Sequence, residues 1–212
     1  MLYEMRTYDL KPRSVAEVEK RFGEAYEKRR KYSELAAFWH TEIGPLNQII
    51  QVWGYESLDE RARIREAAVK DGAWPPDIAE FVVGQRSEIM LPFSFSPNLS
   101  PGSMGPYFEI RTYSYAGGEL PIIRKTWEKA IHVRLQFGPL CAAWHTEFGK
   151  VNNFVHIWPY RSLDERVITR KKAEATGLWP SGRMAERDGG RDYQLISQEN
   201  KIVVPAAFSP LQ

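Results

Sequence analysis

The chain has 212 residues, of which 43% are apolar and 26% are charged, and its 29 basic residues nearly balance its 27 acidic ones. This is the composition of an ordinary globular protein, and the length allows one domain or two small ones. A formal net charge of +2 gives no general attraction to phosphates, so no nucleic-acid partner is predicted. No membrane span and no signal peptide are expected, because no apolar stretch approaches roughly 20 residues. A single cysteine, Cys141, fits a reducing compartment, which predicts a cytoplasmic location, with a matrix-like space as the alternative.

The most informative feature of the sequence is an internal repeat. YEMRTY, beginning at Tyr3, returns 105 residues later as FEIRTY, beginning at Phe108. Two longer segments return at the same offset: WHTEIGPLN at Trp39–Asn47 becomes WHTEFGKVN, and VWGYESLDER at Val52–Arg61 becomes IWPYRSLDER. Chance does not hold one offset across so many identities, so the chain consists of two related copies.

The end of the repeat gives the domain boundaries. Phe95-Ser96-Pro97 matches Phe208-Ser209-Pro210 at an offset of 113, so the second copy carries about eight extra residues. The polar, glycine-rich stretch 181–192 has the composition of a loop and is their simplest location. We therefore predict a first repeat over 1–97, an exposed linker over 98–105 and a second repeat over 106–212.

The first copy shows the predicted elements in chain order. Residues 2–9 alternate in polarity, which predicts a strand, and Ser14 with Glu17 forms a capping box before a helical pattern that runs to Arg29. Residues 35–43 and 47–55 are strand-like, and Gly44-Pro45-Leu46 joins them as a hairpin. A second capping box at Ser57–Glu60 opens a charged helix ending near residues 71–72, and 85–91 form a final strand.

This order, βαββαβ, predicts an α+β fold made of two ferredoxin-like repeats. An antiparallel sheet with both helices on one face leaves its other face in need of cover. Two copies in one chain supply that cover, so we expect their sheets to pair as an internal pseudo-dimer with a closed or half-closed barrel.

Alternation along the strands sorts the side chains onto two faces. In the first copy, Glu4, Arg6 and Tyr8 share one face, while Tyr3, Met5 and Thr7 share the other. Because burying charge against helices is costly, we expect the helices to cover the more apolar face. The polar sets of both copies are then predicted to face the cleft between the sheets.

These polar sets contain the candidate site residues. Two His-x-Glu pairs lie on strands at a spacing that suits acid/base chemistry, so the candidate catalytic residues are His40, Glu42, His145 and Glu147. The arginines, phenols, indoles and remaining imidazole resemble the lining of a ligand site, and the candidate ligand-binding residues are Arg6, Tyr8, Trp53, Arg111, Tyr113, His156 and Trp158. The alternative is an ion-pair network with a purely structural role. With four histidines and one cysteine, no metal site and no cofactor are predicted.

Three further residues have two interpretations each. Trp74 and Trp179, each before a proline, are expected to pack against the end of the second helix of their copy, with a ligand wall as the alternative. Cys141 aligns with Ala36, which favours a small core residue over a nucleophile.

The repeated YEMRTY, WHTEIGPLN, VWGYESLDER and Phe-Ser-Pro segments resemble the NIPSNAP family, with two tandem copies covering essentially the whole chain. The resemblance implies the dimeric α/β-barrel fold, and it leaves a further homo-oligomer open. It implies no defined reaction. Animal members are associated with mitochondria, vesicle traffic and mitochondrial quality control, and relatives on the barrel fold include cofactor-free monooxygenases, haem-degrading enzymes and hydrophobic-ligand binders.

Three functions therefore remain open from the sequence. The first is binding of a small aromatic or apolar molecule in the cleft, with or without cofactor-free acid/base or monooxygenase-type chemistry. The second is a scaffold whose charged cleft only fastens the two halves, and the third is haem or metal binding through a histidine. The copies also differ, with Phe38 replaced by Ala143 and Gln51 by His156. This difference predicts that one half is more open beside Ala143, and Lys150-Val151 in place of Pro45-Leu46 predicts a different hairpin.

Overall fold

The computed structural model describes residues 1–180 and 193–212; the loop predicted at 181–192 lies outside them. The chain forms two compact units. The first unit comprises 1–91, 99–103 and 201–212, and the second comprises 92–98 and 104–200. The end of each sequence repeat therefore belongs to the compact unit built mainly from the other repeat.

The first repeat contains the predicted βαββαβ order with one added 3₁₀ turn. Its elements are β1 (Leu2–Leu10), α1 (Val15–Arg29), β2 (Leu35–Ile43), β3 (Gln48–Tyr55), α2 (Leu58–Lys70), the turn at Ala79–Phe81 and β4 (Val82–Pro92). The final strand begins three residues earlier than the predicted start at residue 85.

The described part of the second repeat has the same order. Its elements are β5 (Tyr107–Tyr115), α3 (Leu120–Leu135), β6 (Ala142–Phe148), β7 (Asn153–Tyr160), α4 (Leu163–Ala175) and β8 (Leu195–Pro205). Each of these six elements therefore has a counterpart in the first repeat.

The sheets are antiparallel throughout the described pairings. β1 lies between β3 and β4, so Arg6 is opposite Gln51 on one side and Ser87 on the other. β2 pairs with β3 and with β8, and β7 pairs with both β5 and β6. The strand order β1-β3-β2-β8-β5-β7-β6-β4 is that of a closed barrel, which confirms the predicted α+β fold class.

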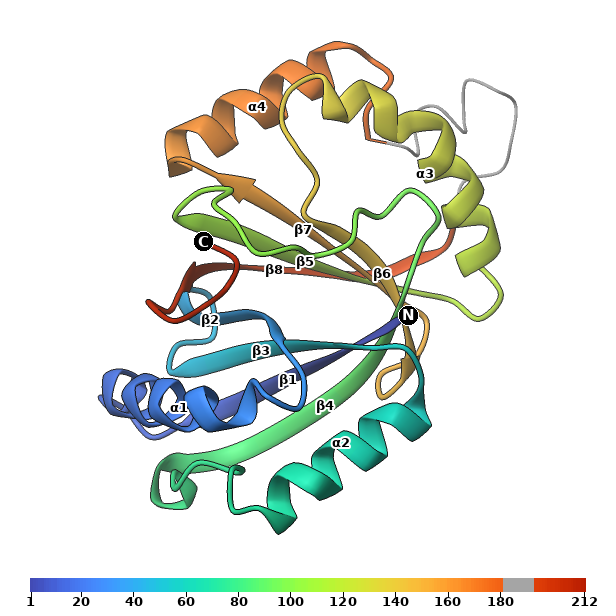
Figure 1. The fold of residues 1–212 in the computed structure, drawn as a ribbon. Helices are drawn as coiled ribbons and strands as arrows, with labels where there is room; N and C mark the ends of the chain where they lie inside the picture. Colours follow the sequence, from blue (N-terminus) through green and yellow to red (C-terminus); the bar gives the residue numbers. More distant parts are fainter. Residues whose placement is uncertain (181–192) are drawn as a thin grey trace. The chain divides into compact units, whose positions relative to one another are not determined.

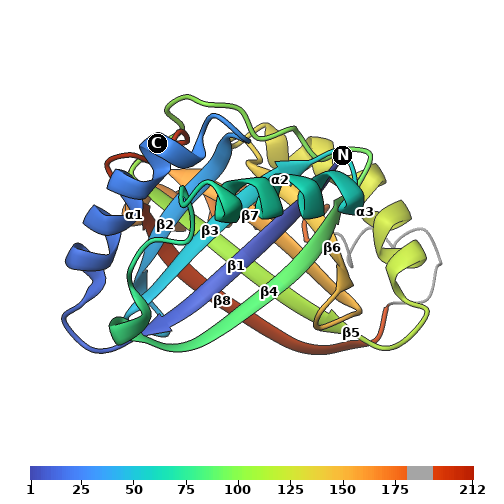
Figure 2. The same ribbon diagram turned by 60° about the horizontal axis from the view of Figure 1, so that its bottom comes forward.

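Within each unit, both helices lie on one face of the sheet. Figure 1 shows α1 and α2 on the same side of β1 and β3, and α3 and α4 on the same side of β5 and β7. Figure 2 looks onto the helical face of the first unit, with β2, β3, β1 and β4 side by side behind α1 and α2. The central side chains of that sheet face, such as Glu4, therefore meet a helix.

The two capping boxes before α2 and α4 are confirmed. Ser57 Oγ accepts a hydrogen bond from the Glu60 amide at 3.1 Å, and Ser162 Oγ accepts one from the Glu165 amide at 3.0 Å. The capping box predicted at Ser14 is wrong, because that hydroxyl donates to the Lys11 carbonyl at 2.7 Å and makes no cap bond. The backbone of Ser14 is in the helical region, with φ of −101° and ψ of −7°, whereas Ser57 and Ser162 have the extended conformation typical of an N-cap residue.

The hairpins of the two repeats have similar backbones despite their different sequences. Asn47 and Asn152 have φ angles of 56° and 59°, in the left-handed region that asparagine tolerates, and Gly44 and Gly149 have φ angles of 119° and 109°. The prediction of a different hairpin at Lys150 is therefore wrong. The glycine and asparagine at its ends set the turn, and both are retained.

The repeated Phe-Ser-Pro segments complete the compact units. Ser209 Oγ accepts a hydrogen bond from the Phe38 amide at 2.9 Å, and the Phe208 ring lies 4.8 Å from the Phe38 ring. In the second unit, Ser96 Oγ accepts from the Ala143 amide at 2.9 Å. The motif thus satisfies a strand amide that would otherwise be buried without a partner.

No helix in the described ranges is long and apolar enough to cross a membrane.

Candidate functional site

The polar strand residues face the helices, which corrects the sequence-based assignment of faces. Glu4 on β1 contacts Arg61 on α2, and His40 on β2 contacts Glu19 on α1. The prediction that these residues face a cleft between the sheets is therefore wrong. The opposite face is also buried and is more apolar; it includes Tyr3, Met5, Ala37, Trp39, Ile50 and Val52.

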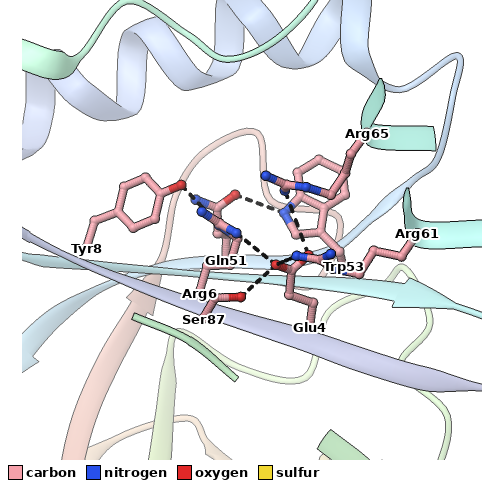
Figure 3. A network of polar contacts seen from close by, with 8 residues as sticks. All are labelled: Glu4, Arg6, Tyr8, Gln51, Trp53, Arg61, Arg65 and Ser87. Carbon is pink, nitrogen blue, oxygen red and sulfur yellow. Dashed lines mark hydrogen bonds and ion pairs between the residues drawn. The ribbon is translucent and has the colours of Figure 1, made fainter. Parts of the chain in front are cut away.

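Glu4 is the centre of a charged network in the first unit (Figure 3). The side chain is fully buried. Its carboxylate accepts two hydrogen bonds from Arg61, at 2.6 and 2.9 Å, and one each from Arg6 and Ser87, at 2.8 and 2.7 Å. Arg65 lies 3.8 Å away. A buried carboxylate surrounded by donors of this kind is stable in its ionised form.

The pKa of Glu4 records the balance of these effects. Burial acts to raise it, but the hydrogen bonds from Arg61, Ser87 and Arg6 outweigh burial and lower the pKa to about 2. Two of the sequence-predicted ligand residues extend the network, since Arg6 Nε donates to the Tyr8 hydroxyl at 3.1 Å. A third, Trp53, donates its indole N–H to Gln51 Oε1 at 2.8 Å.

The four candidate acid/base residues do not form His–Glu pairs. Glu42 and Glu147 are both exposed. His40 Nδ1 instead lies 2.7 Å from Glu19 Oε1, and this contact raises the pKa of His40. His145 stacks near Phe93, with ring centroids 5.4 Å apart, and burial lowers its pKa.

The corresponding charged network in the second unit is less complete. Glu109 Oε1 accepts hydrogen bonds from Arg111 and Arg166, both at 2.6 Å, and from Asn200 at 3.0 Å. Among the described residues, Glu109 Oε2 and Arg166 Nε have no hydrogen-bond partner. Arg170, the counterpart of Arg65, lies 3.5 Å from Glu174 on its own helix.

A partly enclosed cavity of about 230 Å³ lies beside this network, between the sheet of the second unit and its helices. Its walls are rich in aromatic rings: Tyr113, Trp127, Trp158, Tyr160, Trp179 and Tyr193. Most of its polar lining carries charge or donates hydrogen bonds: Arg111, Arg134, His156, Arg170, Glu174 and Gln198. Apolar walls with a few polar groups are the usual composition of a small-molecule site.

His156 is the most deeply buried polar residue of this lining, with 2% of its side chain exposed. Its Nδ1 accepts a hydrogen bond from Trp158 Nε1 at 2.7 Å, so in the neutral ring the proton is on Nε2. Burial, together with Arg111, Arg170 and Arg134, holds the pKa of His156 well below 6.5. The neutral imidazole therefore offers one N–H donor, and within the described residues that nitrogen has no partner.

Comparison with known proteins places the chain in a family. The family model NIPSNAP matches it twice, over residues 3–97 and 108–210. The chain belongs to the NIPSNAP family. Human NipSnap homolog 3B is 30% identical over 218 residues, which cover 99% of this chain and 85% of the human protein. Human NipSnap homolog 3A is 29% identical over 220 residues, covering 100% of this chain and 86% of the human protein.

A solved structure outside the NIPSNAP sequences shares the fold. It is a putative monooxygenase from Lactobacillus acidophilus NCFM, similar over 97% of this chain and 94% of its own, with a TM-score of 0.61 and 10% identity. At that identity the likeness shows the fold and nothing about chemistry.

In this NIPSNAP chain, the sequence-predicted ligand residues divide between the two units. Arg111, Tyr113, His156 and Trp158 line the cavity of the second unit, whereas the other three belong to the network around Glu4. Trp179 lines the cavity, and its ring lies 4.9 Å from that of Trp127 on α3, which is the first helix of its copy and not the second helix named in the prediction.

The sequence reasoning missed Arg134 as a candidate site residue. It lies on α3 with 3% of its side chain exposed, stacked 4.1 Å from the ring centre of Trp158. A signal was available, because Arg29 and Arg134 occupy the same position on the otherwise apolar stripe of each first helix. An arginine repeated on a buried stripe is unusual enough to indicate a polar partner beneath it.

The opening predicted beside Ala143 is absent from the described residues, because Phe93 fills that place. The Phe93 ring lies 5.1 Å from Phe154, and the Phe93 amide donates to the Ala143 carbonyl at 3.0 Å. In the first unit, Ala206 donates to the Phe38 carbonyl in the same way, at 3.0 Å. The first unit thus pairs a large Phe38 with a small Ala206, and the second pairs a small Ala143 with a large Phe93. The total side-chain volume of the pair is the same in both units.

Cys141 is buried, as expected of a core residue, and burial raises the pKa of its thiol to about 12. A thiol that stays protonated at neutral pH is a poor nucleophile.

Proposed function

We propose that the second unit binds a small aromatic molecule in the cavity between its sheet and helices α3 and α4. The cavity combines aromatic walls with one buried donor, His156 Nε2–H, that has no partner among residues 1–180 and 193–212. Buried donors are nearly always satisfied, so an acceptor supplied by a ligand explains this one. The proposal keeps the aromatic ligand expected from the sequence and moves its site into the layer between helices and sheet.

The volume limits the size of this ligand. A cavity of about 230 Å³ is below the range of roughly 300–1,000 Å³ found for drug-sized ligands, whereas about 150 Å³ suffices for benzene. One or two fused rings with a small polar group therefore fit. The proposal is binding alone: His40, Glu42, His145 and Glu147 do not line this cavity, and the putative monooxygenase contributes only its fold.

The first unit supports a second, structural role. Its Glu4 carboxylate is bonded to Arg6, Arg61 and Ser87, and Tyr8 is buried with its ring 6.1 Å from Phe22. We propose that this network fastens β1, α2 and β4 together. This role is structural, like the alternative raised by the sequence, but it joins elements within one unit and does not fasten the two halves; ligand binding is proposed for the second copy alone.

Ligand-observed saturation-transfer NMR with the neutral probes benzamide and indole tests the binding proposal. Gln198 is exposed and lines the cavity, so Gln198→Trp should narrow the entrance without disturbing the core. Gln85 is its exposed counterpart on β4, which makes Gln85→Trp the matched control. We expect transfer to both probes in the native protein, reduced transfer in Gln198→Trp and unchanged transfer in Gln85→Trp. No transfer to either probe, or equal transfer in all three proteins, would contradict the proposal.

A further inference from the structure

The cavity of the second unit presents mainly hydrogen-bond donors to a ligand. His156 contributes Nε2–H, which has no partner in the part of the chain that the structure describes, and its Nδ1 already accepts from Trp158. The guanidinium groups of Arg111, Arg134 and Arg170 contribute only donors. A ligand that satisfies these groups must therefore supply acceptors.

Positive charge exceeds negative charge around the cavity. Two of the nearby arginines, Arg111 and Arg166, are paired with Glu109. Arg170 has Glu174 at 3.5 Å, and Glu174 is the one carboxylate among the described lining residues.

Within the described ranges, Arg134 is the arginine in this group whose hydrogen-bond partners are all neutral. Its guanidinium donates to the Tyr160 hydroxyl at 3.1 Å and to the Gly138 carbonyl at 3.5 Å. The side chain is buried, with 3% exposed. Glu109 interacts with Arg134 electrostatically, but no described carboxylate forms an ion pair with it. A buried cation without a direct ion pair is costly, and a bound anion would offset that cost.

The comparison with the first unit indicates that Arg170 is available for such an anion. Arg65, its counterpart, lies 3.8 Å from the buried Glu4. In the second unit Glu109 is bonded to Arg111 and Arg166, just as Glu4 is bonded to Arg6 and Arg61, but the ion pair described for Arg170 is with Glu174 on α4. Since 33% of the Arg170 side chain is exposed, its pairing with Glu174 is a weak surface contact. Little would be lost if Arg170 turned to a ligand.

We propose that the ligand of this cavity is a small aromatic carboxylic acid, bound as the carboxylate by Arg134, Arg170 and the Nε2–H of His156. Its ring lies among Trp127, Trp158 and Trp179. This inference rests on the proposed binding function and adds the chemical class of the ligand. Planar guanidinium groups match a carboxylate well, because two parallel N–H donors meet its two oxygens.

A comparison of benzoate with benzamide tests whether the negative charge of the ligand matters, because the two molecules have nearly the same size. At pH 7 and low ionic strength, benzoate should bind about tenfold more tightly than benzamide, as expected for one charge-assisted hydrogen bond. This advantage should shrink as salt is added, because screening weakens the attraction to the partly exposed Arg170. Titrations by ligand-observed NMR give both dissociation constants on the intact protein.

Variants of Arg170 test whether its guanidinium is responsible for the tighter binding of benzoate. In Arg170→Gln, benzoate should lose most of its advantage over benzamide, while Arg170→Lys should retain part of it. Arg65→Gln, the matched change in the first unit, should leave both dissociation constants unchanged. Thermal unfolding of each variant separates a lost contact from a lost fold.

The possible results distinguish this inference from the proposed function. If benzamide binds as tightly as benzoate, or if Arg65→Gln weakens benzoate as much as Arg170→Gln does, the carboxylate inference is overturned and the binding function stands. If benzoate, benzamide and indole all fail to bind, the carboxylate inference and the proposed binding function are both overturned.

Discussion

At the scale of single residues, the buried Glu4 shows how a charge can be retained inside a fold. Its burial is unfavourable to the ionised form, but Arg6, Arg61 and Ser87 all donate to it. The result is a pKa of about 2, below its ordinary value of 4.5. Because the folded protein holds the ionised form more strongly than the unfolded chain does, the carboxylate stabilises the fold.

The pH dependence of this contribution can be predicted with its sign. The folded pKa lies below the unfolded one, so the stabilisation is fully present above pH 4.5 and is lost as the pH falls towards 2. From the size of the shift it amounts to about 3 kcal/mol. Glu4→Gln should lower the free energy of unfolding by about 3 kcal/mol at pH 7, measured by urea denaturation.

The difference in the free energy of unfolding between the native protein and Glu4→Gln should become smaller when urea denaturation is repeated at pH 3. Glu109 is unchanged in the variant and keeps its own acid sensitivity, so the comparison isolates Glu4. An equal gap at pH 7 and pH 3 would show that the carboxylate charge contributes nothing to stability.

The two WHTE motifs show what a short motif cannot predict. Identical residues surround His40 and His145, yet burial lowers the pKa of His145, whereas contact with Glu19 raises that of His40. The difference comes from the helix above each strand, where Arg124 replaces Glu19. The histidine environment depends on a residue far away in sequence, so strand spacing alone suggested a partner, Glu42, that the imidazole does not use.

At the scale of elements, alternation grouped the strand residues correctly but did not identify the helical face. Glu4, Arg6 and Tyr8 do share one face. The rule that helices cover the more apolar face failed because both faces are buried, and the helices bring their own charged partners. Arg61 and Arg65 belong to the charged helix predicted after Ser57, and both are half-buried against Glu4.

The exchange of large and small residues between the units predicts a compensating pair of mutations. Phe38 is fully buried, so Phe38→Ala should cost about 3–5 kcal/mol. Adding Ala206→Phe should recover a substantial part, because the second unit already pairs Ala143 with Phe93 in this arrangement. Urea unfolding of the single and double variants measures the coupling.

Ala206→Phe alone should overpack the site and cost about 1–3 kcal/mol. A double variant no more stable than Phe38→Ala would mean that the two positions do not exchange volume as their contacts indicate.

At the scale of the whole molecule, the sequence repeat predicted the duplication but not the composition of the compact units. Residues 201–212 belong with the first unit and 92–98 with the second. Self-similarity locates copies along the chain, whereas the ends of strands pair wherever hydrogen-bond partners are available. The Phe-Ser-Pro motif recurs because each copy of it supplies a hydroxyl to one strand amide, at Phe38 or Ala143.

Duplication also explains how the two copies can differ in role. Both retain a buried Glu on the first strand and an Arg on the first helix. In the first unit Arg6, Arg61 and Arg65 lie around Glu4, whereas in the second unit Arg170 pairs with Glu174 and, among the described residues, His156 Nε2 has no partner. The first copy can therefore contribute a structural network, while the second is the copy for which ligand binding is proposed.

A crystal structure of the protein soaked in benzamide tests this division of roles most directly. The account predicts density for the ring between Trp127, Trp158 and Trp179, with its carbonyl oxygen within hydrogen-bonding distance of His156 Nε2, and no density at the equivalent place beside Trp53 and Trp74. A second unit without bound probe at saturating concentration, or equal occupancy in both units, would contradict it.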